Sequence, residues 1–299
     1  MPASWSREKA APDTAAQRIG RQNTILWGKA RTHQVSNFPG PLSIKFVIRG
    51  SAVWQTDDAR WAVGPGTYLI LNHGRTYSIT VDATDPVETF CLFFKPGFVE
   101  DIWRGSVTPD LALLDAPEDA TAGVNFFERM QPPDRVTALL RRTYAQCCEG
   151  GGLNHDWQAG AFIEVGRAML ETQRSVEREA ARIPVAKPST RQELLRRVSR
   201  GRDFMESAST DSITLEEIAR AACLSPYHFH RRFRQTFGER PHQYLVRRRL
   251  ERAAEMLRSS DIPVTQVCMD SGFASLGSFS ALFRRRYGMP PSQWRIAGR

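Results

Sequence analysis

The sequence lacks the features that mark membrane proteins and disulfide-rich secreted proteins. No run of about 18 apolar residues occurs, so no membrane-spanning helix is expected. Residues 1–24 form a polar lead-in without the apolar core of a secretory signal, which predicts a cytoplasmic protein. The five cysteines include no Cys-x-x-Cys pair and are odd in number, which favours reduced thiols. The adjacent Cys147 and Cys148 suggest a redox switch or, because helix neighbours point about 100° apart, simple packing.

Lysine is absent from residue 189 onward, although 20 arginines lie there. Residues 1–188 carry 21 basic and 21 acidic residues, whereas residues 189–299 carry 20 basic and 11 acidic ones. The whole net charge of +9 therefore belongs to the C-terminal segment. This division predicts a neutral domain joined to a domain that binds a polyanion. Charge alone also leaves open a merely soluble, basic helical domain.

Short segments rich in β-branched and aromatic residues predict strands between residues 42 and 94. The stretch LSIKFVIRG alternates with the period of two that is expected of a half-buried strand. Turn signals at TDDAR and GPG separate the segments SAVWQ, WAV and TYLILN, and ETFCLFF ends the run. Several short strands at this spacing predict a small sandwich or barrel.

From residue 134 the apolar residues recur at the spacing of amphipathic helices. Two helices are predicted, over residues 134–149 and 157–175, with a glycine-rich connection. Such helices either cap the β core or form an interface with a partner, and both roles are compatible with the pattern. Two prolines and the loss of periodicity predict a linker over residues 179–190, which leaves residues 25–178 as the first domain.

The basic segment contains an internal repeat. Its two copies align at an offset of 49 residues in their first halves and of 50 in their second halves. The aligned pairs are Leu215 and Val264, Ile218 and Val267, Ala219 and Cys268, Phe229 and Phe279, Phe233 and Phe283, Gly238 and Gly288, Pro241 and Pro291, and Tyr244 and Trp294.

Each copy predicts a helix, a tight turn and a second helix, over residues 214–235 and 263–286. Ser225 and Ser275 stand where they would cap the second helices. The intervening stretch PHQYLVRRRLERAAEMLRSS predicts a helix about 30 Å long. Two helix-turn-helix units held apart by that helix match the separation of about 34 Å between successive major grooves of DNA.

The second helix of the first unit contains a His-x-His pair, within SPYHFHRRFRQTFG. On a helix His228 and His230 lie about 200° apart, so they cannot bind one metal ion. The phenylalanines recur every four residues and predict a buried stripe. The open face, which we expect to contact DNA, is formed by Tyr227, His230, Arg231 and Arg234.

The stretches IARAACLSPYHFHRRFRQTFGERPHQYLVRRRLERAAEML and GFASLGSFSALFRRRYGMPPSQWR resemble the AraC/XylS transcription regulators. The resemblance implies an α+β protein of two domains, with an all-α, seven-helix DNA-binding domain over residues 191–299. It implies a cupin-like N-terminal β-barrel with a helical hairpin, which senses a small organic effector or mediates dimerisation through the helices at 134–149 and 157–175. It also implies a nucleoid-associated regulator that contacts RNA polymerase. Activation is the commoner role in that family, and repression is the alternative.

The same resemblance assigns the residues that would face DNA. The first reading helix would present Tyr227, His230 and Arg231, and the second would present Leu276, Gly277 and Ser278.

Two positions depart from the family pattern. Cys223 stands at a turn position that often holds glycine, whereas Gly272 keeps it in the second unit. Ala281 stands where an arginine commonly contacts DNA, which leaves open whether the second unit reads bases. The arginines at 284–286 either hold phosphates or form a solvated face.

The β segment resembles the cupin-like ligand domain of the same family. A metal-binding cupin carries G-x5-P-x-G-x2-H, but this chain has Asn72 in place of the proline and Tyr77 in place of the histidine. No His-x-His pair precedes LSIKFVIRG, so neither a metal nor another cofactor is expected. Five polar or aromatic residues are candidates to line an effector pocket, although each also fits ordinary strand surface or core: Arg49, Trp54, Tyr68, His73 and Tyr77.

The sequence therefore predicts an effector-responsive, sequence-specific DNA-binding regulator. A regulator without an effector is one alternative, and an architectural protein that compacts DNA with little sequence preference is another. An enzyme fused to a DNA anchor is a third, but it needs a metal triad or a nucleophile with its base, and neither is found in the sequence. We expect no catalytic activity.

Overall fold

The computed structural model describes residues 18–107, 124–149, 155–185, 187–208, 210 and 212–297. The chain divides into two compact units, residues 1–178 and 179–299. Within the described ranges, no helix is both long enough and apolar enough to cross a membrane.

The strands of the first unit form one antiparallel sheet. They are β1 (Thr24–Pro39), β2 (Ser43–Arg49), β3 (Ala52–Gln55), β4 (Arg60–Val63), β5 (Tyr68–Leu71), β6 (Thr76–Phe93) and β7 (Met130–Gln131). Their order is β4-β3-β6-β2-β5-β7, and β1 pairs with β6 outside this path.

The long strand β6 rolls this sheet into a near-barrel. It pairs with β1 along most of its length, with β3 in its first half and with β2 in its second half. Register shifts interrupt the β1 pairing between Ala30 and Thr32 and between Val35 and Phe38. Because such irregularities bend a strand, they let the two halves of the sheet turn toward each other.

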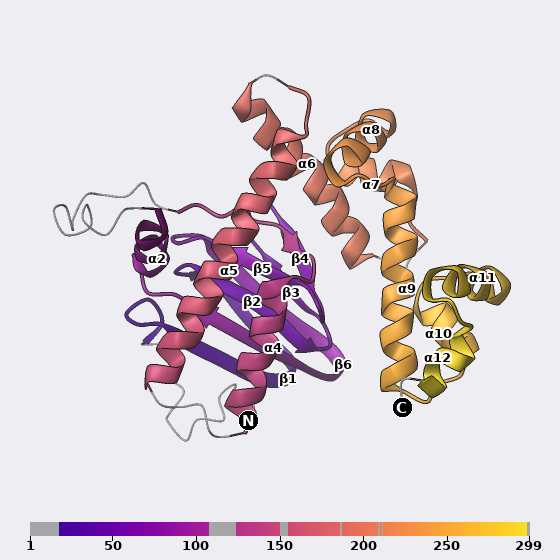
Figure 1. The fold of residues 1–299 in the computed structure, drawn as a ribbon, viewed down its shortest axis with the longest axis horizontal. Coiled ribbons are helices and arrows are strands. Elements are labelled where there is room, and N and C mark those ends of the chain that lie inside the picture. Colours follow the sequence, from indigo (N-terminus) through magenta and orange to yellow (C-terminus); the bar gives the residue numbers. More distant parts are fainter. Residues whose placement is uncertain are drawn as a thin grey trace. The chain divides into compact units, whose positions relative to one another are not determined.

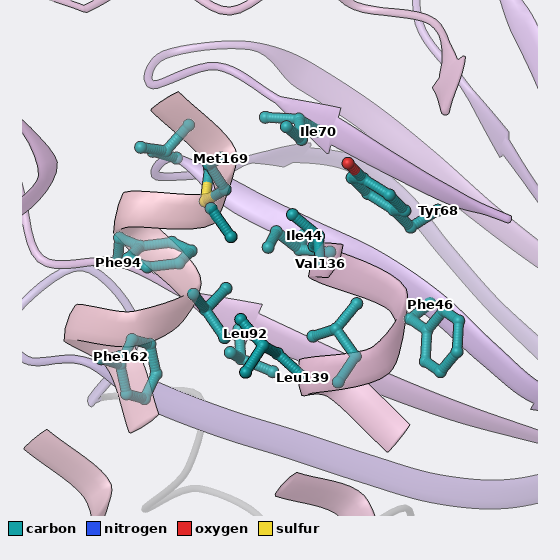
Figure 2. Packing of buried hydrophobic residues seen from close by; sticks show 14 of the residues in the cluster. Ile44, Phe46, Tyr68, Ile70, Leu92, Phe94, Val136, Leu139, Phe162 and Met169 are labelled. Atoms are coloured by element: carbon teal, nitrogen blue, oxygen red, sulfur yellow. The ribbon is translucent and has the colours of Figure 1, made fainter. Parts of the chain in front are cut away.

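The described part of the first unit contains the helices α2 (Phe98–Val107) and α4 (Arg135–Cys148) and most of α5 (His155–Ala181). In Figure 1, α4 and α5 lie across one face of the sheet. The apolar side chains between that face and the helices form the outer cluster, which includes Ile44, Phe46, Tyr68, Leu92, Val136, Phe162 and Met169 (Figure 2).

The opposite face of the sheet encloses a second core, the inner cluster. Its side chains come mainly from strands and include Val47, Trp54, Trp61, Leu69, Leu71, Tyr77, Val87, Cys91 and Phe93. The sheet is thus buried on both faces along its central strands.

This double burial corrects the expectation for β2. The alternation in LSIKFVIRG predicted a half-buried strand, but every residue from Ser43 to Val47 is buried. Ser43, Lys45 and Val47 of that pattern lie on the face of the inner cluster, whereas Arg49 at the end of the strand is exposed. The strands were also predicted to begin at residue 42, whereas β1 starts at Thr24. The predicted segment ETFCLFF is only the last part of the longer strand β6.

Seven helices form the described part of the second unit. They are α6 (Pro188–Ser207), α7 (Leu215–Ala221), α8 (Pro226–Phe237), α9 (Pro241–Ser259), α10 (Val264–Asp270), α11 (Leu276–Tyr287) and α12 (Pro291–Ala297). The short helices α7 and α8 lie at one end of α9, and α10 to α12 lie at the other (Figure 1). The helical repeat and the long connecting helix predicted from the sequence are confirmed.

The helix α9 contributes to the apolar cores of both helix-turn-helix units. Tyr244 and Leu245 pack with α6, α7 and α8, whereas Leu250 and Leu257 pack with α10 and α11. Its 19 residues correspond to a length of about 28 Å. At the first core α6 crosses α8 so closely that a Cβ on Gly201 would lie 2.3 Å from Phe229 Cε2.

Candidate nucleic-acid interface

The turns of the two helix-turn-helix units share one hydrogen-bonding pattern. Leu224 N–H donates to Ala219 O and Cys223 N–H to Arg220 O, each at 3.0 Å. In the second unit the corresponding donors are Phe273 N–H, to Cys268 O at 3.0 Å, and Gly272 N–H, to Met269 O at 2.8 Å. These paired bonds form the Schellman motif that ends a helix and redirects the chain.

Both turns require a left-handed residue at the same position. Cys223 has φ 51° and Gly272 has φ 82°. The non-glycine residue that the sequence placed at the first turn therefore adopts the conformation that glycine adopts in the second.

The second helix of each unit begins and ends in the same way. Ser225 Oγ accepts from His228 N–H, and Ser275 Oγ accepts from Ser278 N–H, as the capping pattern predicted. Gly238 and Gly288 end the two helices in the left-handed conformation, each with φ 79°. Local signals thus fix the length of α8 and α11 at 12 residues each.

The helix α8 has a sharply divided surface. Phe229 and Phe233 are completely buried, and they hold the helix against α6 and α9. Tyr227 is 71% exposed, and Arg231 and Arg234 are also exposed. Neither arginine side chain makes a hydrogen bond or an ion pair within the described part of the chain. Their donors are therefore free for an anionic partner.

His230 is half-buried, so it lies at the edge of this face, whereas His228 is exposed. Across the described ranges, no three His, Cys, Asp or Glu side chains gather where they could hold a metal ion.

The helix α11 presents a different set of side chains on the same scaffold. Leu276 is 42% exposed, and Gly277, Ser278 and Ala281 are exposed beside it. Its buried residues are Phe279 and Phe283, which pack against α9.

The three arginines at the end of α11 differ in their environment. Arg284 and Arg285 are exposed and make no side-chain hydrogen bond or ion pair with any described residue. Arg286 Nη2 lies 2.7 Å from Glu251 Oε1 of α9. Arg284 and Arg285 can therefore either contact phosphate or remain solvated, whereas Arg286 has a partner within the chain.

Glu251 of α9 is the centre of an ion-pair network that joins the two helix-turn-helix units. Besides Arg286, its carboxylate contacts Arg247 Nη1 at 3.2 Å and Arg248 Nη1 at 2.7 Å. These arginines hold the pKa of Glu251 below its usual range, against the effect of burial, which raises it.

The network continues from α9 to α6 and to the turn after α8, which both belong to the first helix-turn-helix unit and its core. Arg247 contacts Glu239, in the turn after α8, at 2.8 Å, and Arg248 contacts Glu206 of α6 at 2.7 Å. Tyr244 donates its hydroxyl hydrogen to the same Glu206. This network was not predictable from the sequence, because its members are spread over four elements.

The five candidate effector residues do not gather in one place. Trp54 and Tyr77 both belong to the inner cluster, where Trp54 is 1% exposed and Tyr77 is 5% exposed. Arg49 and His73 are exposed, the latter in a turn.

Tyr68 lies in the outer cluster, on the side of the sheet that faces the helices. Its hydroxyl donates to Asp134 Oδ2 at 2.7 Å, and Thr172 Oγ1 of α5 donates to the same oxygen at 2.8 Å. Burial and the Asp134 charge raise the pKa of Tyr68. Asp134 also caps α4, so this contact ties strand β5 to both helices.

A buried cation, which was not among the residues predicted to form a site, contacts the inner cluster. Lys45 of β2 donates from Nζ to Tyr77 Oη at 2.6 Å. The sequence signal for its burial is its position between two apolar residues, Ile44 and Phe46. The alternating pattern of the strand, however, predicted that Lys45 faces solvent.

Two family models match the chain. The model of the Helix-turn-helix domain matches residues 218–297, and that of the AraC-like ligand binding domain matches residues 38–160. The first therefore spans α7 to α12 with both turns, and the second spans most of the rolled sheet and the α4 helix.

Two curated relatives match about a third of the chain. The chain is 34% identical over 94 residues to the probable transcriptional regulator LumQ of Photobacterium leiognathi, covering 31% of this chain and 38% of LumQ. It is 38% identical over 92 residues to the HTH-type transcriptional activator RhaS of Escherichia fergusonii, covering 31% of this chain and 33% of RhaS. The chain thus matches about a third of the length of these curated relatives.

Among solved structures, ToxT from Vibrio cholerae is 12% identical, with a TM-score of 0.34. That match covers 92% of this chain and 98% of ToxT.

Proposed function

Because the chain belongs to the AraC/XylS family of transcription regulators, we propose that it binds specific DNA sequences through α8 and α11. We further propose that a small organic effector bound by the first unit controls transcription through this DNA-bound protein. The printed name of RhaS, a transcriptional activator, favours activation over repression.

The observation that carries this proposal is that α8 and α11 share the same local structure. Each is fixed by the same turn, the same serine cap and the same phenylalanine stripe, yet each exposes a different set of side chains. A repeated scaffold with divergent exposed residues suits a protein that reads two different groups of bases in successive major grooves.

The exposed side chains of α8 suit direct base reading. Arg231 offers the fork of donors that matches the acceptors of guanine, and Tyr227 and His230 add further polar contacts near it. Arg234 lies one turn further along the helix, where a contact to phosphate would position the unit without reading sequence.

The exposed side chains of α11 offer fewer hydrogen bonds to base edges. Leu276 suits apolar contact with a thymine methyl group, and Ser278 supplies one hydroxyl. Because Ala281 has no polar group, we propose that α8 provides most base-specific hydrogen bonds. Arg284 and Arg285 of α11 would then contribute salt-sensitive contacts to phosphates.

The remaining assignments of the proposal concern partners and location. A homodimer formed through α4 and α5 would pair two copies on repeated DNA sites, and a promoter-bound dimer would contact RNA polymerase. We propose a cytoplasmic, nucleoid-associated regulator that is not an enzyme.

The variant Arg231→Ala tests the reading role of α8. It should weaken binding to the specific site by about 1–3 kcal/mol, because a bidentate base contact is lost. The matched control is Arg252→Ala on α9, which removes the same charge from an exposed arginine outside both reading helices. Fluorescence anisotropy with specific and non-specific duplexes at one salt concentration measures both changes.

Equal losses for the two variants would contradict base reading by Arg231. Equal affinity of the unmodified protein for specific and non-specific duplexes would favour the architectural alternative.

A further inference from the structure

Lys45 places an amine inside the rolled sheet, where charged groups are rarely found. The residue is 1% exposed. Its Nζ lies 4.2 Å from the centre of the Tyr77 ring and 4.1 Å from that of the Phe93 ring. These rings and the Tyr77 hydroxyl are the partners that the described chain supplies to it.

No described carboxylate forms an ion pair with this amine. Burial lowers the pKa of Lys45 to about 8, and the Cys91 thiol is the other ionisable group that affects it. The amine is thus still protonated at neutral pH, with three N–H donors. A buried cation without a counter-charge destabilises a fold, and an anion bound beside it would offset that cost.

Two hydroxyl groups on the same face also have unused hydrogen-bonding capacity. Ser43 Oγ and Thr89 Oγ1 are buried and have no hydrogen-bond partner among the described residues. Ser43 lies two positions before Lys45 on β2. On the neighbouring strand β6, Cys91 is the residue paired with Lys45, and Thr89 lies two positions before it. Because side chains alternate along a strand, these residues share the inner face. Buried hydroxyl groups are normally paired, so both can form a hydrogen bond with a polar group of a bound molecule.

We propose that this inner face binds the carboxylate of a small organic monoacid, with Lys45 as its counter-ion and the Ser43, Tyr77 and Thr89 hydroxyl groups as hydrogen-bond donors. The monoacid would be the effector, so the inference rests on the proposed function of the first unit.

The surroundings select this class of ligand over others. One cation balances one negative charge, and a dianion would bring a second charge into an apolar core without a partner. A neutral sugar would leave Lys45 without a counter-charge. The inner cluster also supplies Trp54, Trp61 and Phe93, which suit an apolar or aromatic body attached to the carboxylate.

Tyr77 adds an independent reason to place the ligand here. It stands where the related metal-binding motif has a histidine ligand, and its hydroxyl accepts a hydrogen bond from an ammonium group.

The test compares the full-length protein with its Lys45→Met variant by thermal unfolding at pH 7. The probes are butyrate, benzoate and phenylacetate, each beside its uncharged amide. We expect at least one carboxylate to raise the Tm of the unmodified protein and its amide to have no effect. The variant should bind that carboxylate at least tenfold more weakly. Without ligand, the variant should melt at the same temperature as the unmodified protein or higher, because a buried charge has been removed.

A structural role of Lys45 would instead lower the Tm of the ligand-free variant by several degrees, which would overturn the proposal. Equal stabilisation of both proteins, or no stabilisation by any of the three carboxylates, would also overturn it.

The pH dependence gives a second readout that needs no variant. Carboxylate binding should weaken above pH 8, where Lys45 loses its proton, and an affinity that stays constant from pH 6 to 10 would contradict the proposal. Tyr77 and Cys91, the titratable groups that face Lys45, are neutral through the lower part of this range because burial raises the pKa of both. Specific DNA binding without ligand, measured in parallel, distinguishes a failure of this inference from a failure of the proposed regulator function.

Discussion

Cys223 adopts a left-handed backbone conformation in the turn of the first helix-turn-helix unit, at the position that Gly272 occupies in the second helix-turn-helix unit. A side chain with a Cβ meets the following carbonyl oxygen in this region, which destabilises the conformation by about 1–2 kcal/mol. The hydrogen bonds of the Schellman motif and the burial of Leu224 and Ala219 around it hold the residue there. The first turn therefore forms in spite of its local backbone preference.

The substitution Cys223→Gly should raise the free energy of unfolding by about 1 kcal/mol, since it removes this strain at an exposed site. The matched substitution Gly272→Ala should lower it by about 1–2 kcal/mol, because it introduces the same strain. Urea unfolding of both variants measures the two changes. A loss of stability in Cys223→Gly would show that the cysteine side chain contributes more than its backbone strain.

Single residues were predictable from the sequence where local chemistry decides their environment. The caps at Ser225 and Ser275 and the exposure of Arg231 follow from helix periodicity and from side-chain hydrogen bonding to free N–H groups. Lys45 was not predictable, because its burial depends on strands from β3 to β6 that fold over it from distant parts of the chain. The inference that a lysine in an alternating strand faces solvent fails wherever both faces of a sheet are covered.

At the scale of elements, α9 joins the apolar cores of the two helix-turn-helix units. Its apolar side chains enter each core, and its charged side chains form the Glu251 network on another part of its surface. Because Glu251 contacts Arg286 at the end of α11 and, through Arg247, the turn after α8, it links the ends of both reading helices. We expect this network to fix the relative orientation of α8 and α11.

The substitution Glu251→Gln should reduce the preference of the protein for specific over non-specific DNA. It removes the charge that holds three arginines, so Arg286 becomes free for unspecific phosphate contact. The free energy of unfolding should fall by about 1–2 kcal/mol, because charged hydrogen bonds in a half-buried site are weakened. The matched control is Glu255→Gln, an exposed glutamate on the same helix with no described partner.

Titration of specific and non-specific duplexes with each variant gives the ratio of affinities. If Glu255→Gln lowers this ratio as much as Glu251→Gln does, the effect reflects net charge alone, and the network has no role in orienting the helices.

The elements themselves were predictable to different degrees for a physical reason. The helices of the second unit carry their own signals, in caps, apolar stripes and terminal glycines such as Gly238 and Gly288, so their bounds agree closely with the sequence analysis. The strands depend on non-local pairing. The strand β1 has polar residues along its outer edge and no strong alternation, and only its pairing with β6 makes it a strand.

At the scale of the whole molecule, the two units have separate cores. The apolar clusters of the second unit contain residues from 198 onward, and those of the first end at residue 170. A fragment over residues 182–299, which begins after α5, should therefore fold and bind the same DNA sites. It should not respond to an effector, because it lacks the rolled sheet. Comparison of DNA affinity for the fragment and the full chain, with and without the effector, measures both expectations. A fragment that responds to the effector would exclude the first unit as the sensor.

The Lys and Arg positions of α8 and α11 are all arginine, which has a chemical consequence in the cell and when the protein is coupled to a sensor surface. Guanidinium groups keep their charge at any physiological pH and do not react with acyl donors that modify amines. Lys187 is the one lysine of the second unit, and it precedes α6. Enzymatic or chemical acetylation would therefore leave the positive charge of α8 and α11 intact. Amine-directed coupling to a sensor chip would likewise leave the side chains of α8 and α11 unmodified.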